Sequence, residues 1–208
     1  MTPATQRSPK GKETRDRLLA SARATFQARG FSSTRVADIA QHAGVAHGTF
    51  YTYFDSKHDV FHAALLEVRD EVVHLQDVGP IWAVSPLQII RRATASYLAF
   101  YQRNIGMMTL LEQVAIHDEQ FRDVRLEMRR AVAERVQRFI RHLQRNGVAD
   151  PSLDARYVAT ALTGMVDRFA FVWLALGEDF EEEQAVETLA RLWCAAIVGC
   201  RAELDGTD

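Results

Sequence analysis

Apolar residues recur at helical spacing along most of the chain, and turn-forming residues separate the apolar segments. In the first segment the apolar side chains fall at Leu18, Leu19, Ala22 and Phe26. Steps of three and four residues place them on one face of a helix. Gly30 follows, a residue type that readily takes the left-handed conformation of a helix end. The pattern predicts a helix that stops at this glycine.

Two short apolar segments lie on either side of Gly44. The first begins after Thr34, a residue that can cap a helix, and the second begins at Val45 and carries Phe50 and Phe54. Helices of about two turns are not stable alone in water, so we expect the two phenylalanines to pack against neighbouring helices. The sequence therefore predicts two short helices joined by a tight turn.

A longer helix is expected next, because residues 56–59 read Ser-Lys-His-Asp, a pattern typical of a helix start. Residues 78–86 break it. No segment has the alternation of a strand, so the chain is predicted to be all-α, with about nine helices in total. The later helices are expected near residues 86–103, 105–116, 118–146, 152–176 and 181–204.

Composition agrees with a soluble globular protein, since 48% of the 208 residues are hydrophobic and 25% are charged. The longest unbroken apolar run, Phe169–Leu176, is too short to cross a bilayer, and the polar N-terminus does not resemble a signal peptide. We therefore expect no membrane association and a cytoplasmic location.

Charge is unevenly distributed although the net charge is only −2. Residues 1–60 contain nine Lys or Arg and five acidic residues, whereas the rest of the chain contains 16 basic and 22 acidic residues. A basic N-terminal part suggests local contact with an anion such as DNA, although this asymmetry alone is weak evidence.

The two short helices around Gly44 have the arrangement of a helix-turn-helix, in which the second helix presents its first residues to base edges in the major groove. Imidazole can donate to guanine, and hydroxyl groups can bind phosphate. The alternative is an ordinary helical hairpin with a solvated polar face. The polar residues concerned are His47, Thr49, Tyr51, Thr52 and Tyr53.

The same segment carries a family resemblance. Its signature comprises Gly30-Phe31, Ile39-Ala40, Ala43-Gly44-Val45, Gly48, Phe50-Tyr51, Tyr53-Phe54 and Ser56-Lys57. With these residue types at this spacing, residues 14–61 closely resemble the N-terminal DNA-binding domain of TetR-family transcriptional regulators. The resemblance implies a three-helix helix-turn-helix domain at residues 12–56. A loose basic arm is expected at residues 1–11, and a helical ligand-binding and dimerisation domain at residues 57–208.

The resemblance also implies DNA-contacting roles. By position in the family motif these fall to Thr34, Arg35, Ala37, His47, Gly48, Thr49, Tyr51, Tyr53 and Lys57. Two residues depart from the usual pattern. Ala46 stands where the family has serine or threonine, which removes a capping hydroxyl. Arg35 replaces a small hydroxyl residue, so the operator sequence cannot be carried over.

The family plan implies an effector cavity in the second domain, and bulky apolar residues support it, because aromatic rings and flexible thioethers suit a large hydrophobic ligand. The alternative is that most of these side chains fill the core. The candidates for ligand binding are Trp82, Tyr97, Phe100, Tyr101, Met107, Met108, Leu111, Phe121, Met128, Phe169 and Trp173.

The last two helices have more apolar surface than one small core needs, and the family plan pairs them in a dimer. Two copies could bury these faces as a four-helix bundle, whereas a monomer would cover them with its own helices. The candidates for a dimer interface are Leu162, Met165, Phe169, Val186, Leu189, Trp193 and Ile197.

Some polar residues interrupt the apolar segments. They could orient a ligand, pair with each other or face water, and they are Glu112, Gln113, Asp167 and Arg168. His58 and His62 have the spacing of helical metal ligands, but with no third ligand nearby a solvated pair is the preferred interpretation. Cys194 and Cys200 are expected to be buried thiols rather than a disulfide.

The sequence thus predicts a homodimeric DNA-binding regulator of the TetR type that binds a palindromic operator. We expect it to be a repressor released by a hydrophobic small molecule. It carries no catalytic triad, phosphate loop or metal cluster, so we expect neither enzymatic activity nor a cofactor. The alternatives are a helical lipid carrier or enzyme that uses the second domain, or an activator without an effector.

Overall fold

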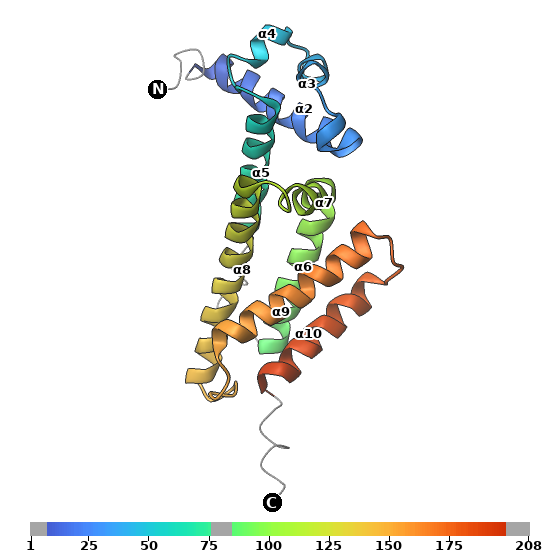
Figure 1. Ribbon diagram of the computed structural model, residues 1–208. Coiled ribbons are helices and arrows are strands. Elements are labelled where there is room, and N and C mark those ends of the chain that lie inside the picture. Colours follow the sequence, from blue (N-terminus) through green and yellow to red (C-terminus); the bar gives the residue numbers. More distant parts are fainter. Residues whose placement is uncertain (1–7, 76–84, 199–208) are drawn as a thin grey trace, which may run out of the picture. The chain divides into compact units, whose positions relative to one another are not determined.

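A computed structural model describes residues 8–75 and 85–198, and within them every regular element is a helix (Figure 1). The prediction of an all-helical fold is confirmed. Trp82 and Cys200 lie outside the described residues. The helices are α2 (Pro9–Ser33), α3 (Val36–His42), α4 (His47–Phe50), α5 (Lys57–Val73), α6 (Pro86–Arg103), α7 (Ile105–Val114), α8 (Glu119–Arg145), α9 (Ala155–Ala170) with its π-helical extension η2 (Phe171–Ala175), and α10 (Glu182–Val198).

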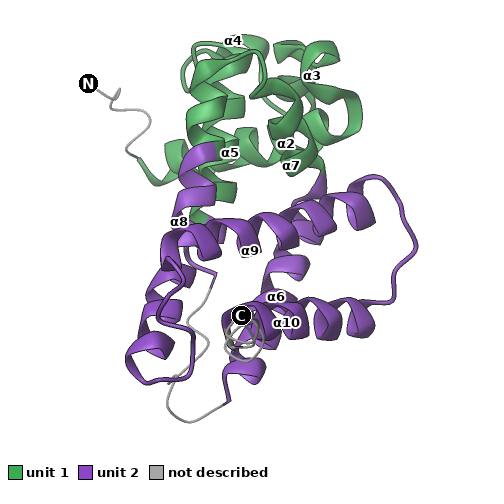
Figure 2. Cartoon of the chain, turned by 60° about the horizontal axis from the view of Figure 1, so that its bottom comes forward, with its two compact units in different colours: residues 1–70, 106–125 green, residues 71–105, 126–208 purple. Residues whose placement is uncertain are grey.

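The chain divides into two compact units, drawn in different colours in Figure 2. Unit 1 comprises residues 1–70 and 106–125, and unit 2 comprises residues 71–105 and 126–208. Unit 1 thus contains α2, α3, α4 and all of α7 except Ile105, so a segment from the middle of the chain packs with the N-terminal helices. Helices α5 and α8 have residues in both units.

Helix α2 begins at Pro9, where the Ser8 hydroxyl accepts the main-chain N–H of Gly11 at 3.0 Å. Residues 9–11, which the sequence assigned to the arm, are therefore helical. At Gly30 the backbone leaves the helix, with a φ of 75° and a ψ of 168°. A side chain would be strained at this φ, so glycine permits the break that the sequence predicts here.

Aromatic side chains build much of the core of unit 1. The Phe61 ring of α5 lies 4.8 Å from Phe26 of α2, 4.9 Å from Phe31 and 5.1 Å from Phe121 of α8, measured between ring centroids. Phe26, Phe61 and Phe121 are at most 1% exposed. Such clusters contribute stability through burial and through edge-to-face contacts.

Helix α4 is shorter than the sequence predicts, with four residues instead of about two turns. The N–H groups of Thr49, Thr52 and Tyr53 all bond to the carbonyl three residues earlier, which is the tighter 3₁₀ pattern. Ala46 occupies the cap position and offers no side-chain oxygen. Packing of Phe50, which is fully buried, must hold this helix in place.

Unit 2 is built around α6, α9 and α10, which pack against one another. Ser85 caps α6 by accepting the N–H of Gln88, and Asp154 caps α9 by accepting the N–H of Arg156. Phe100 and Tyr101 of α6 and Met128 of α8 are among its buried side chains. These faces form a helical core in the second half of the chain, as the apolar pattern predicts.

One stretch of the described chain, Ala155–Ala175, is long and apolar enough to cross a membrane by length and composition alone. Isolated polar residues such as Asp167 and Arg168 divide this stretch, so its longest unbroken apolar run is much shorter. Only 22% of its most apolar window is buried within the chain. The same composition occurs in a helix whose apolar side is covered by another protein chain.

Candidate nucleic-acid interface

Helix α4 presents a polar face to solvent. His47, Gly48 and Tyr51 are exposed, Thr49 and Tyr53 are half-buried, and Phe50 points into the core. The imidazole of His47 lies edge-on to the Tyr51 ring, with 5.4 Å between centroids. The first residues after the turn therefore combine an aromatic nitrogen, a phenol hydroxyl and an approachable backbone at Gly48.

The start of α3 adds a second polar surface. Arg35 and Ala37 are exposed, whereas Thr34 is buried, and its hydroxyl donates to the Gly30 carbonyl at 2.7 Å. The Thr34 side chain is thus engaged in holding the end of α2. Of the three residues assigned to this surface, only Arg35 offers an exposed charge.

Asp38 organises the first turn of α3. Its carboxylate accepts the main-chain N–H of Arg35 at 3.0 Å and forms an ion pair with Arg29 at 2.9 Å. The Arg35 N–H, followed by the charge of Arg29, holds the pKa of Asp38 below its ordinary value. The Arg35 side chain projects from a turn whose backbone is already fixed.

Lys57 is engaged within the protein. Its Nζ donates to the carbonyls of Phe31 and Ser32 at 2.9 and 3.2 Å, and it lies 4.8 Å from the centroid of the Phe31 ring. Its ammonium group therefore ties the start of α5 to the end of α2. The family resemblance implies that this lysine steadies the contact with the DNA backbone. The observed geometry favours an indirect role, in which Lys57 holds α2 and α5 together.

Three contacts in unit 1 were not foreseen. Arg17 and Ser21 of α2 bond to main-chain carbonyls of Ala43 and Ile39. His58 bonds to Asp118 at 2.8 Å, so His58 is not a freely solvated partner of His62. Each contact joins residues at least 18 positions apart, for which the local sequence carries no signal. Among the described residues, no three potential ligands are placed to hold a metal ion.

The predicted ligand-binding residues divide between the two units. Met107, Met108, Leu111 and Phe121 are buried in unit 1. In unit 2, Phe100, Tyr101 and Met128 are buried, whereas Tyr97, Phe169 and Trp173 are half-buried. Phe121 packs in the aromatic cluster of unit 1, so its contacts are those of a core residue.

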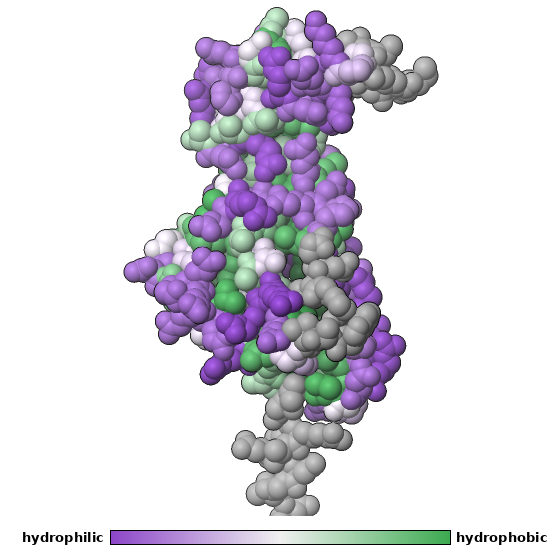
Figure 3. All heavy atoms as spheres, turned by 180° about the vertical axis from the view of Figure 1, so that it is seen from behind, coloured by the Kyte–Doolittle hydropathy of each residue, from purple (hydrophilic) through white to green (hydrophobic). Residues whose placement is uncertain are grey.

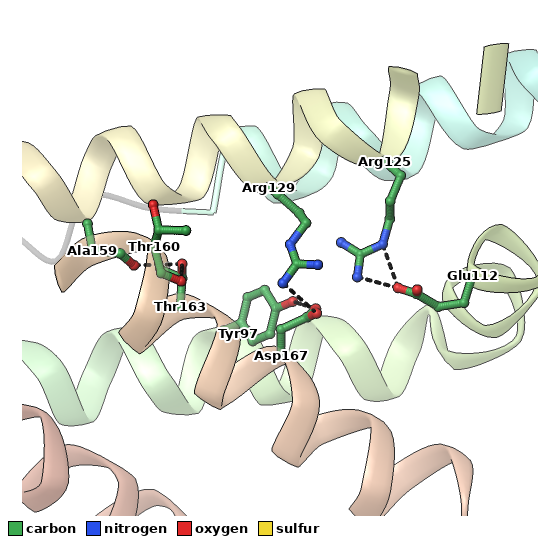
Figure 4. A network of polar contacts seen from close by, with 8 residues as sticks. All are labelled: Tyr97, Glu112, Arg125, Arg129, Ala159, Thr160, Thr163 and Asp167. Carbon is green, nitrogen blue, oxygen red and sulfur yellow. Dashed lines mark hydrogen bonds and ion pairs between the residues drawn. The ribbon is translucent and has the colours of Figure 1, made fainter. Parts of the chain in front are cut away.

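A polar cluster joins side chains of α6, α8 and α9 in unit 2 (Figure 4). The Tyr97 hydroxyl donates to Asp167 Oδ1 at 2.6 Å, and Arg129 lies 3.7 Å from Asp167 Oδ2. The Asp167 side chain is only 16% exposed, so this carboxylate is paired inside the chain rather than directed to water. Within unit 1, Glu112 pairs with Arg125 in a similar way.

The predicted interface residues also differ in exposure. Leu162, Leu189, Trp193 and Ile197 are at most 8% exposed within one chain, and Met165, Phe169 and Val186 are half-buried. The exposed large apolar side chains of the last helices are instead Tyr157 on α9, at 75%, and Leu192 on α10, at 50%. Most of the described surface visible in Figure 3 is hydrophilic, with apolar side chains between the polar ones.

Helix α4 is short and exposed, it follows a tight turn, and helices α2 and α3 support it. This arrangement defines a helix-turn-helix DNA-binding protein. Residues 18–64 match the family described as bacterial regulatory proteins, tetR family, and residues 90–199 match the C-terminal domain of the transcriptional regulator EthR. The chain belongs to the TetR family of transcriptional regulators, with a C-terminal domain of the EthR type. This is a family of DNA-binding regulators and not of enzymes.

Individual relatives are similar to this chain over most of their own length. The chain is 26% identical to the HTH-type transcriptional regulator EthR of Mycolicibacterium smegmatis over 206 residues, covering 95% of this chain and 93% of that protein. It is 28% identical to the HTH-type transcriptional repressor BepR of Brucella suis over 170 residues, covering 78% and 81%. The solved structure of the TetR-family regulator PfmR from Thermus thermophilus has the same fold, with a TM-score of 0.67 at 20% identity, covering 86% and 97%.

Proposed function

We propose that the protein is a cytoplasmic repressor that binds a palindromic operator as a homodimer and is released by a hydrophobic small molecule. The observation that carries this proposal is the exposed face of α4, where His47 and Tyr51 stand beside Gly48. Direct reading of bases requires side chains that extend from the N-terminal part of such a helix into the major groove.

Exposed apolar residues on the last helices support the dimer. On α9 the exposed Tyr157 and Ala161 and the half-buried Met165 follow one helix face, and on α10 Leu192 and Ala196 do the same. The stretch Ala155–Ala175 is mostly unburied within one chain, which suits a surface that a second copy covers. On α10 this exposed face differs from the face that the sequence pattern predicts as the interface. Two of the predicted residues, Leu189 and Trp193, are already buried within one chain.

Repression is the expected outcome of operator binding. A dimer that occupies a promoter excludes other proteins from the same DNA, and a relative of similar length is named a transcriptional repressor. An activator would need a surface for the transcription machinery in addition to its DNA-binding face. The proposal is therefore a repressor.

Features of unit 2 support a hydrophobic effector with a polar group. Tyr97, Phe169 and Trp173 are half-buried aromatic residues on α6, α9 and the extension of α9. The indole N–H of Trp193 is buried and has no hydrogen-bond partner among the described residues. Buried donors are usually satisfied, so this N–H suits an acceptor on a bound molecule.

Selection from random duplex DNA tests the proposal without knowledge of the operator. The purified protein is expected to enrich an inverted repeat whose half-sites are about one helical turn apart, roughly 34–36 Å, or somewhat more. Light scattering should give twice the chain mass. Recovery of DNA without any shared sequence, or a monomer at micromolar concentration, would contradict the proposal.

A further inference from the structure

The turn that leads into α4, residues 43–46, is called here the recognition turn. It has few supports of its own, because α4 contains four residues and its cap residue, Ala46, lacks a side-chain oxygen. Within the turn region, the N–H of Gly44 bonds to the Gln41 carbonyl and that of Val45 to the Ala40 carbonyl. These bonds close the end of α3 but do not tie the turn to another helix.

Helix α2 supplies that tie through Arg17. Its Nη2 lies 2.5 Å from the Ala43 carbonyl oxygen and 3.4 Å from that of Gly44. A guanidinium is a strong donor that remains charged at all physiological pH values. It also places a positive charge where the carbonyls at the end of α3 carry partial negative charge. Arg17 therefore ties the recognition turn to α2, a helix that is not part of the turn.

Ser21 forms a second tie one helical turn further along α2. Its hydroxyl donates to the Ile39 carbonyl at 2.7 Å, and its oxygen lies 3.1 Å from Nδ1 of His42. A hydroxyl has a single proton, so Ser21 accepts a hydrogen bond from the Nδ1–H of His42. The arrangement fixes both the last turn of α3 and the proton position on His42.

We propose that Arg17 and Ser21 are positioning residues for DNA recognition, which hold the recognition turn so that His47 and Tyr51 keep one orientation. Gly44 fits this role, because its φ is 65° and a Cβ there would come within 3.4 Å of Arg17 Nη2. The four-residue α4 inherits its direction from the turn. Loss of the ties lets α4 sample orientations that do not match the major groove, and the affinity for the specific site falls.

The test begins with the protein free of DNA, so its outcome does not depend on the operator. Arg17→Met keeps the aliphatic stem and removes the donors. Amide exchange at Gly44, Val45 and Thr49, whose N–H groups are bonded within the turn and to its last residue, is expected to become about tenfold faster or more, as for loss of a hydrogen bond to a charged group, while exchange in α6 is unchanged. Ser21→Ala should shift the His42 ring proton away from Nδ1, visible in the ring ¹⁵N shifts. Unchanged exchange at the turn would overturn the proposal.

The second part measures binding to the selected duplex and to random DNA over a range of salt concentrations. Arg17→Met should lose about tenfold or more in affinity for the selected duplex, with little change on random DNA and the same salt slope. Arg17→Lys, which keeps a charged donor, should restore most of the affinity. Arg92→Met, which removes an exposed charge on α6, serves as the control.

The competing role is a direct phosphate contact by Arg17. In that case Arg17→Met would weaken binding to both DNAs alike and lower the salt slope by about one, and either result would refute the positioning role. If Arg17→Met unfolds the domain, the Arg17→Lys and Ser21→Ala variants test the positioning role instead. Normal amide exchange at the recognition turn in both of these variants, combined with a loss of DNA affinity, would also refute the positioning role.

Discussion

The imidazole Nε2 of His58, in the first turn of α5, lies 2.8 Å from Oδ2 of Asp118, which precedes α8. The other carboxylate oxygen of Asp118 accepts the N–H of Phe121 at 3.3 Å. The His58 ring also packs 4.4 Å from the Phe121 ring. One carboxylate thus joins the start of α5, immediately after Lys57, to the start of α8.

This pair predicts a pH-dependent contribution to stability. The hydrogen bond from His58, and then the main-chain N–H of Phe121, hold the pKa of Asp118 below its ordinary value. A lowered pKa means that the contribution is present above the ordinary value, near pH 4, and is lost as the pH falls through the lowered pKa. Asp118→Asn should therefore reduce the melting temperature at pH 6–7 and make progressively less difference as the pH falls below about 4.

Circular dichroism melts at several pH values check this, with the exposed Asp123→Asn as the control. A melting difference between Asp118→Asn and the parent that stays the same from neutral to strongly acidic pH would show that the carboxylate charge is not involved.

Lys57→Met is predicted to act on folding as well as on DNA binding. It removes two hydrogen bonds from an ammonium group to the Phe31 and Ser32 carbonyls, and hydrogen bonds to charged groups contribute about 1.5–3 kcal/mol each. We expect the free energy of unfolding to fall by at least about 1.5 kcal/mol in denaturant titrations. Lys12→Met, an exposed lysine of α2, should have little effect. Equal stability of the two variants would return Lys57 to a purely DNA-contacting role.

The dimer face predicts which substitutions give monomers. Tyr157→Asp or Leu192→Asp places a charge on the exposed apolar face of α9 or α10, and a buried unpaired charge opposes association. The dissociation constant of the dimer should rise about 30-fold or more, as for loss of a central interface residue. Sedimentation or light scattering measures it, with the exposed Val148→Asp as the control. Dimers that persist unchanged in both variants would place the interface elsewhere.

An effector should weaken operator binding through a reciprocal coupling. Long-chain acyl compounds, sterol-like molecules and aromatic drugs can be screened by thermal shift and then titrated into the protein–DNA complex. A typical coupling of about 1–3 kcal/mol weakens DNA binding roughly 5- to 150-fold, and DNA must weaken ligand binding by the same factor. A Trp193→Phe variant, which lacks the indole N–H, should bind such a ligand less tightly. Hits that stabilise the protein but leave DNA affinity unchanged would contradict release by that ligand.

Local pattern was sufficient for most of the helices, though not for the length of α4 or the start of α2, and for the inward residues of the helix-turn-helix. The spacing of Phe50 and Phe54 predicted two packed side chains, and both are at most 3% exposed. The break at Gly30 and the turn at Gly44 followed from the conformations that glycine permits, since both have positive φ. These features depend on neighbours within a few positions, which the sequence displays directly.

Contacts between distant residues could not be read in the same way. Nothing near Lys57 in the sequence points to the Phe31 carbonyl, 26 positions earlier. The exposed apolar face of α10 could not be predicted for a different reason. The pattern predicted an interface with Leu189 and did not include Leu192, yet the packing of α10 against α6 and α9 buries Leu189 and leaves Leu192 exposed.

The most direct measurement is the affinity of the protein and its His47→Ala variant for the selected inverted repeat and for random DNA, by fluorescence anisotropy at fixed salt. If α4 reads bases through its exposed face, the variant should lose roughly 1–3 kcal/mol of binding free energy on the selected duplex and almost none on random DNA. Equal losses on both DNAs, or no preference of the parent protein for the selected duplex, would contradict sequence-specific recognition through this helix.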